Sequence, residues 1–176
     1  METRPTIIDF VEHYTREYAS LTFLREKVDG KWTETSFEQT RLEAYRVAAG
    51  LIAMGLKKDD KVSLLSEGRN LWVIGELGIL YAGGVNVPLS IKLEESNDLR
   101  FRIRHSDSRY VMVSGMQLRK IRNILPECPL VEKVIVLDEV EDLREGEVSI
   151  YKVMEQGDAY LAEHMDEFKA RYSSVG

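Results

Sequence analysis

The chain has 176 residues, of which 24 are basic and 30 acidic, giving a formal net charge of −6. This length can bury a hydrophobic core without disulfides, and the acidic balance argues against binding nucleic acid or anionic lipid. One cysteine excludes a disulfide framework, and no apolar run reaches the roughly 18 residues of a membrane span. We therefore expect a soluble, cytoplasmic protein with no membrane span and no nucleic-acid partner.

A hairpin and a helix are the first elements that the sequence predicts. Two β-like runs, Leu21–Glu26 and Lys31–Thr35, flank an Asp-Gly pair, which is the strongest short hairpin signal because glycine accepts a positive φ. Ser36 and Gln39 form a capping-box pattern, so a helix is expected to start at Ser36. Gly55 suits the position that follows the end of this helix.

The next strand and helix are unusually apolar. Val62–Leu65 is predicted to be a strand, and Asn70 can cap a helix over Leu71–Ala82 that is apolar on nearly every side. Glycine inside a helix costs about 1 kcal/mol relative to alanine, so a close neighbour is needed to explain Gly75 and Gly78. We predict a tight contact between this helix and the sheet.

Two glycines then join this helix to a strand. Because the chain must turn at once from the helix into Val85–Leu89, Gly83 or Gly84 is predicted to have a positive φ. Glu76 is the only acid in the helix, and a position that reaches solvent is favoured over a buried functional carboxylate. The predicted structural residues of this joint are Gly75, Gly78, Gly83, Gly84 and Pro88.

The alternation of strands and helices continues to the C-terminal part. The expected elements are a helix around Glu94–His105, a strand Tyr110–Val113, a helix capped by Ser114 and stopped by Pro126, a strand Lys133–Leu137, an acidic loop Glu139–Glu147, and helical segments over Ile150–Tyr172 broken near Gly157. This order predicts an α/β fold, with βαβ units in a mostly parallel sheet covered by helices on both faces. The expected parts are a hairpin at about 21–35, βα repeats at about 36–138 and a C-terminal helical segment at about 149–172.

Residues with recognisable chemistry are sparse. The chain has no glycine-rich phosphate loop, and the span from Gly78 to Gly83 lies inside a predicted helix, whose N–H groups are already bonded. The three histidines have no metal-ligand spacing with each other or with Cys128. We therefore predict no catalytic, cofactor-binding or metal-binding residue in this chain.

An ordered series of short motifs resembles the start of the adenylate-forming acyl-CoA synthetases, the AMP-binding superfamily that includes long-chain fatty-acid–CoA ligases and luciferases. The series covers about residues 5 to 175 and is most similar to the long-chain fatty-acid branch. Its motifs are GKWTETS, GLKKDD, VSLLSE, WVIGELGILYAGG, VNVPLS and FRIRHSDSRYVMVS.

The resemblance implies that residues 1–176 are an incomplete N-terminal portion of an AMP-binding (adenylation) domain. In this family a carboxylate attacks the α-phosphate of ATP, and the thiol of coenzyme A then displaces AMP. The resemblance thus implies a fatty acid, ATP, Mg²⁺ and coenzyme A as substrates and cofactors of the parent enzyme. In the relatives, the TSGTTGxPKG phosphate loop and the later motifs lie beyond the position of Gly176. The fragment by itself is therefore expected to be inactive and to bind no cofactor.

Two classes of function stay open. The first is a fragment of a fatty-acyl-CoA ligase, and the second is a free-standing, non-catalytic binding or dimerisation module of the same fold. The fragment is expected to expose apolar faces through which two copies could pair, whereas a clean monomer would favour the module. An unrelated nucleotide-binding α/β protein is disfavoured because the phosphate loop is missing.

Overall fold

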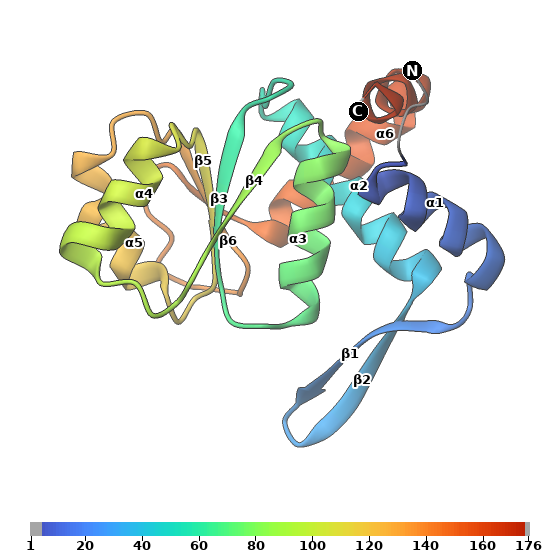
Figure 1. Ribbon diagram of the computed structural model, residues 1–176, viewed down its shortest axis with the longest axis horizontal. Coiled ribbons are helices and arrows are strands. Elements are labelled where there is room, and N and C mark those ends of the chain that lie inside the picture. Colours follow the sequence, from blue (N-terminus) through green and yellow to red (C-terminus); the bar gives the residue numbers. More distant parts are fainter. Residues whose placement is uncertain (1–4, 175–176) are drawn as a thin grey trace.

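A five-stranded parallel sheet forms the centre of the molecule (Figure 1). The computed structural model describes residues 5–174, apart from the side chains of residues 96 and 97. The strand order is β4-β3-β5-β6-β7, and each neighbouring pair is parallel. The strands are β3 (Lys61–Leu65), β4 (Val85–Leu89), β5 (Tyr110–Val113), β6 (Lys133–Val136) and β7 (Glu147–Ser149). The α/β prediction is confirmed, with β7 as an additional strand at the end of the predicted acidic loop.

Helices cover both faces of this sheet, as the sequence predicts (Figure 1). One face carries α2 (Phe37–Ala53), α3 (Asn70–Tyr81) and α6 (Ile150–Ser173), and the other carries a π-helical turn (Glu95–Leu99), α4 (Arg100–His105), α5 (Leu118–Ile124) and a 3₁₀ turn (Leu125–Glu127). Side chains alternate along each strand, so that Leu64 and Met112 join the first core while Leu65 and Val113 join the second. Two hydrophobic cores therefore lie back to back across one sheet.

Helix α1 (Ile7–Tyr18) is absent from the sequence-based prediction. Its start has a complete capping box, because the Thr6 hydroxyl accepts from the Asp9 N–H at 3.2 Å and Asp9 accepts from the Thr6 N–H at 2.7 Å. The Glu12 carboxylate fastens α1 to the core by accepting hydroxyl protons from Tyr45 at 2.7 Å and Tyr81 at 2.8 Å. The threonine and the aspartate at this spacing are the signal that could have revealed the helix.

The predicted hairpin is confirmed and projects from the body of the molecule (Figure 1). Strands β1 (Thr22–Val28) and β2 (Lys31–Ser36) are antiparallel, and the turn residues Asp29 and Gly30 have φ values of 49° and 80°. Positive φ at both turn residues matches the right-handed twist of the flanking strands. The predicted capping box at the start of α2 is also confirmed: the Ser36 side chain accepts from the Gln39 N–H at 3.2 Å.

The joint after α3 has the predicted conformation at one of its two glycines. Gly83 has a φ of 74°. Its N–H donates to the carbonyl of Leu80 and the Gly84 N–H donates to that of Ile79, both at 2.9 Å. These two bonds form a Schellman motif, which satisfies carbonyls at the helix end. The chain can thus leave α3 and enter β4 without a spacer.

The prediction that both glycines of α3 contact the sheet is only partly correct. Gly75 faces the sheet, since an added Cβ would lie 3.3 Å from the Met112 sulfur in β5. Gly78 instead faces helix α2, because an added Cβ would lie 2.8 Å from the Val47 Cβ. The predicted contact of both glycines with the sheet is therefore wrong for Gly78, whose missing side chain lets two helices approach.

Gly78→Leu should lower the free energy of unfolding by about 1–3 kcal/mol, because the leucine side chain overpacks the contact with α2. Gly84→Val should also destabilise, since an added Cβ would lie 3.2 Å from the carbonyl oxygen of Asp60. Gly68→Val is the matched control, because nothing lies within 4 Å of an added Cβ there. Gly146 is unsuitable as a control because its φ is 83°. Urea unfolding of the variants measures the difference, and equal values for Gly78→Leu and Gly68→Val would contradict the contact.

Three predicted helix boundaries are wrong. Asn70 does not cap α3, since the N-cap is Arg69 and the Asn70 amide donates to the hydroxyl of Thr35. Ser114 does not cap α5, which starts only after Gln117. The C-terminal helix does not break at Gly157, because α6 continues through it and has its one non-helical residue at His164.

Candidate functional site at the carboxyl edge of the sheet

The order of the strands marks one crevice as a candidate site. From β3 the chain crosses to β4 on one side of β3, and then returns to place β5 on the other side. In open α/β sheets, ligands bind outside the carboxyl ends of the strands at such a switch point. Here the segments that follow the two strands are residues 66–69 after β3 and residues 114–117 after β5.

Polar side chains from three strand ends meet at this edge. The Gln117 amide donates to Glu67 at 2.6 Å, which links the segment after β5 to the segment after β3. Arg69 donates to one oxygen of Asp138 at 2.6 Å, and the Gly115 N–H donates to the other oxygen at 2.6 Å. Asp138 follows β6, so the contacts span the carboxyl ends of β3, β5 and β6. We call Glu67, Arg69, Ser114, Gln117 and Asp138 the edge cluster.

The hairpin is attached next to the edge cluster. The Glu26 carboxylate accepts the backbone N–H of Asn70, the first residue of α3, at 2.7 Å. The Asn70 side chain donates to Thr35 on the second hairpin strand at 3.1 Å. A carboxylate at a helix N-terminus binds an otherwise unbonded N–H group and interacts favourably with the helix dipole. Both hairpin strands are therefore fastened to the start of α3, one residue from Arg69.

The charges of the edge cluster are largely neutralised within it. Burial raises the pKa of Glu67, but the hydrogen bond from Gln117, the nearby Ser114 hydroxyl and the positive charge of Arg69 help to outweigh it, so that this pKa lies below its ordinary value. Arg69 and Asp138 form an ion pair whose side chains are 26% and 32% exposed. Asp138 neutralises the charge of Arg69 and occupies the Gly115 N–H, so these two groups do not form a converging set of free donors for a phosphate group.

Two buried polar atoms of the edge cluster have no hydrogen-bond partner within the described part of the chain. These are the hydroxyl oxygen of Ser114 and the amide oxygen of Gln117. Ser114 is completely buried. Buried polar atoms in native proteins are nearly always bonded, and exceptions concentrate where a sequence is adapted to function rather than to stability.

Ser114→Ala should leave the free energy of unfolding unchanged or raise it by up to about 1 kcal/mol, because the buried hydroxyl that it removes makes no hydrogen bond of ordinary length and angle. Ser63→Ala is the matched control, since the Ser63 hydroxyl is equally buried but bonds Ser108 at 2.7 Å. That variant should be destabilised. Thermal melts of both proteins distinguish the cases, and a marked loss of stability in Ser114→Ala would show that its hydroxyl is bonded.

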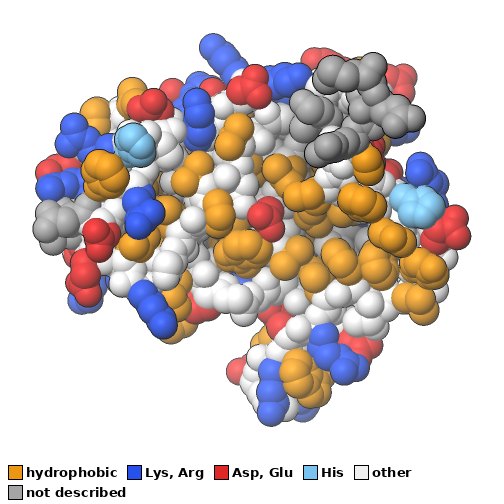
Figure 2. Space-filling view, viewed as in Figure 1, with side chains coloured by type: hydrophobic (Ala, Val, Ile, Leu, Met, Phe, Trp, Pro, Cys, Tyr) orange, Lys and Arg blue, Asp and Glu red, His pale blue; other side chains and the backbone are white. Residues whose placement is uncertain are grey.

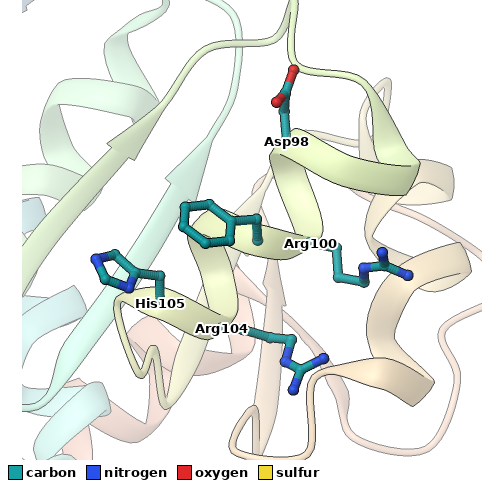
Figure 3. A pocket seen from close by; sticks show the side chains of 5 residues that line it. Asp98, Arg100, Arg104 and His105 are labelled. Atoms are coloured by element: carbon teal, nitrogen blue, oxygen red, sulfur yellow. The ribbon is translucent and has the colours of Figure 1, made fainter.

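A hollow that lies away from the edge cluster is found on α4. Its volume is about 660 Å³, and Asp98, Arg100, Phe101, Arg104 and His105 line it. Figure 3 shows that Arg100 and Arg104 extend to one side of the helix and His105 to the other. Arg100 also pairs with Glu127 at 2.6 Å. The side chains do not converge on a common point, so this hollow is not a built binding site.

The sequence-predicted structural residues and the edge cluster lie at different places. Gly83, Gly84 and the start of β4 belong to the amino edge of the sheet, where the Val85 N–H donates to Asp60. Pro88 is near the other end of β4. No member of the edge cluster is predicted as a site residue from sequence. Their shared position directly after predicted strands is the signal that could have identified them.

Residues 5–174 contain no group of three or more His, Cys, Asp or Glu side chains placed to hold a metal ion. None of the helices in the same range is both long enough and apolar enough to cross a bilayer.

The family described as "AMP-binding enzyme" matches residues 11–169. A medium/long-chain-fatty-acid–CoA/3-oxocholest-4-en-26-oate–CoA ligase of Mycolicibacterium smegmatis is 31% identical over 126 residues, which are 70% of this chain and 23% of that protein. A rat long-chain-fatty-acid–CoA ligase is 29% identical over 125 residues, 70% of this chain and 17% of its own length. The chain thus spans about a quarter or less of these curated relatives.

Solved structures have the same fold. The anthranilate CoA ligase AuaEII in complex with anthranoyl-AMP matches with a TM-score of 0.78 at 24% identity, over 88% of this chain and 29% of that one. Coronafacic acid ligase from Pectobacterium brasiliense matches with a TM-score of 0.74 at 22% identity, over 82% of this chain and 28% of that one. Each of the two solved chains is therefore about three and a half times as long as the part that this chain matches.

Proposed function

Since the chain belongs to the AMP-binding enzyme family, we propose that it is the N-terminal portion of an ATP-dependent long-chain fatty-acid–CoA ligase. The observation that carries this proposal is the match over residues 11–169 together with relatives that are fatty-acid–CoA ligases. The substrates and cofactors of the parent would be a fatty acid, ATP with Mg²⁺, and coenzyme A. The single, buried cysteine fits the reducing cytoplasm, which we propose as the location of the parent.

We propose that residues 1–176 form an incomplete N-terminal part of the adenylation domain. The hairpin β1–β2, the βα repeats from α2 to β6 and the long helix α6 would be parts of this one unit rather than separate domains. Their mutual contacts support that view, since α6 packs on α2 and the hairpin is hydrogen-bonded to the start of α3.

The described residues do not fit a triphosphate. Binding one requires several free N–H or cationic donors directed at a common point, as in a glycine-rich loop before a helix. At the edge cluster, Asp138 neutralises the charge of Arg69 and occupies the Gly115 N–H. We therefore propose that this chain supplies the scaffold of the ligase, and that the residues that bind ATP belong to other parts of the parent.

The 176-residue chain by itself should bind no Mg·ATP and form no acyl-adenylate, because it lacks a phosphate-binding cradle. Isothermal titration of the purified chain with Mg·ATP tests this expectation. The parent, cloned from the surrounding coding sequence, should convert a long-chain fatty acid, ATP and coenzyme A into acyl-CoA, AMP and pyrophosphate. Binding of Mg·ATP by the isolated chain at about micromolar affinity, near −8 kcal/mol, would contradict the proposed scaffold role.

A further inference from the structure

Helix α1 exposes a row of aromatic rings on its outer face. Phe10, Tyr14 and Tyr18 are spaced by four residues, so they lie one above another along the helix. Their exposed fractions are 49%, 42% and 46%. Neighbouring rings stack at centroid distances of 6.3 and 6.0 Å. Tyr14 also contacts His13 and Tyr18 also contacts Phe37, but all three rings of this row still leave much apolar surface in water.

Helix α3 exposes a second apolar strip. Its fully buried residues, among them Ile74, Leu77 and Tyr81, face the core. The opposite side at helical spacing contains Trp72, Val73, Glu76 and Leu80, which are all only half-buried. Figure 2 shows hydrophobic side chains gathered in one band that runs over α3 and on to α1. We call Phe10, Tyr14, Tyr18, Trp72, Val73 and Leu80 the α1–α3 belt.

One acidic group lies within the belt. By helical spacing Glu76 falls between Trp72 and Leu80. One of its carboxylate oxygens accepts from the Asn86 amide at 2.8 Å, and this is the only hydrogen bond to Glu76 among the described residues. A half-buried carboxylate amid apolar side chains favours a partner that brings a hydrogen-bond donor. A partner that covers the belt would therefore need an apolar face and, opposite Glu76, a hydrogen-bond donor.

Strand β4, beside the belt, is a poor template for strand pairing. The Val85 N–H donates to Asp60 on the β3 side, so by alternation Asn86 and Pro88 turn their backbone groups outward. Proline has no N–H, which leaves Asn86 as the one outward donor at the centre of this edge. A partner would thus bind through side chains on the belt rather than by adding a strand.

We propose that the α1–α3 belt is the surface on which the remainder of the parent ligase packs, with an apolar face and an arginine, lysine or amide donor opposite Glu76. This inference rests on the proposed function. The length of the relatives supports this occupant, since the chain covers only 23% of the Mycolicibacterium ligase. A second copy is a poorer fit, because a dimer centred on the belt would bring two Glu76 carboxylates together in an apolar interface.

Cysteine labelling tests the proposal cleanly, because the only cysteine, Cys128, is buried. Tyr14→Cys and Val73→Cys place a thiol on the belt, and Leu143→Cys places one in the acidic loop at 38% exposure. Each variant is made in the isolated chain and in the parent, and maleimide labelling is followed by peptide mass spectrometry. The belt thiols should react at least about tenfold more slowly in the parent, because a covered thiol reacts only when the surface opens. The Leu143→Cys thiol should react equally fast in both proteins.

Equal labelling rates for the belt thiols in an active parent would overturn this inference and leave the proposed function intact. Conversely, a parent that makes no acyl-CoA would refute the proposed function whatever the labelling rates. Protection of the belt thiols in the isolated chain, increasing with its concentration, would identify a second copy as the occupant and also overturn the inference. Adding Glu76→Ala to the parent should restore part of the Val73→Cys reactivity, whereas Glu141→Ala should not.

Discussion

Replacing Arg122 with methionine should destabilise the protein by about 3–5 kcal/mol, because it leaves a buried carboxylate unpaired. The Glu147 side chain is only 2% exposed and the Arg122 side chain 12%. The guanidinium donates to both carboxylate oxygens of Glu147, at 2.8 and 2.7 Å. This pair joins α5 to the edge strand β7, so its loss should also loosen the last strand of the sheet. Urea unfolding at neutral pH measures the change.

The effect of Arg122→Met should depend on pH in a defined direction. In the native protein the hydrogen bonds from Arg122 hold the pKa of Glu147 below its ordinary value. The pair therefore stabilises the fold above the unfolded-state pKa, and this contribution disappears as the pH falls through the lower folded-state pKa. In the variant the Glu147 carboxylate keeps only the Arg144 N–H as a donor, so burial without the guanidinium should raise this pKa relative to the native protein. The difference between the two proteins should consequently shrink as the solution becomes acidic.

The double variant Arg122→Met, Glu147→Met is the control for this prediction. Replacing a buried ion pair with apolar side chains of similar volume is often neutral, so the second substitution should recover most of the lost stability. If Arg122→Met lost the same stability at every pH, or if the double variant were no more stable than the single one, the unpaired carboxylate could not be the cause.

Replacing Gly157 with valine should also destabilise the protein strongly. The loss in the free energy of unfolding should reach or exceed the upper end of the range of about 1–3 kcal/mol that is typical of overpacking. Helix α6 crosses α2 at this residue. An added Cβ would collide with the carbonyl oxygen of Arg46 and lie 2.8 Å from the carbon of the same carbonyl and 3.0 Å from the Gly50 nitrogen. Because these are backbone atoms of a helix, no side chain can turn aside, and the two helices must separate.

Gly157→Ala separates this cause from helix propensity. Alanine favours a helix by about 1 kcal/mol relative to glycine, so an exposed Gly157 would give a more stable alanine variant. With the observed contact, Gly157→Ala should be less stable than the native protein, and Gly68→Ala, which has open space around it, should not be. Thermal unfolding of the two variants decides between these outcomes. A gain in stability at Gly157 would mean that α2 and α6 do not cross closely.

Features encoded by neighbouring residues could be predicted from the sequence. The Asp29-Gly30 turn, the capping box of Ser36 and Gln39, and the helix end at Gly83 each depend on contacts within a few residues. The alternation of strands and helices likewise predicted the α/β class, and the ordered motifs indicated the family. Helix α1 had the same kind of local signal in Thr6 and Asp9. The sequence therefore contained enough information to predict α1, although the prediction did not include it.

The candidate site could not be predicted in the same way, because its members are far apart along the chain. Glu67 and Gln117 are 50 residues apart, and Arg69 and Asp138 are 69 apart. Each alone is an ordinary polar residue after a strand. Only the strand order, with β5 placed beside β3 rather than β4, brings these residues to one edge. The strand order depends on how the whole sheet packs. It cannot be predicted from the hydrophobic periodicity of a single segment.

The sequence by itself therefore determined the class of fold, its local turns and caps, and the family of the protein, since short-range backbone preferences and motif order suffice for these. The tertiary structure alone decided what Gly157, Asn70 and Ser114 do. Asn70 and Gly157 had local preferences, for a cap and for a break, that a distant contact overrode, whereas the helix that Ser114 was predicted to cap starts only after Gln117. Close contact between α2 and α6 needs a residue without a side chain at their crossing, and only the folded chain shows that Gly157 is the residue placed there.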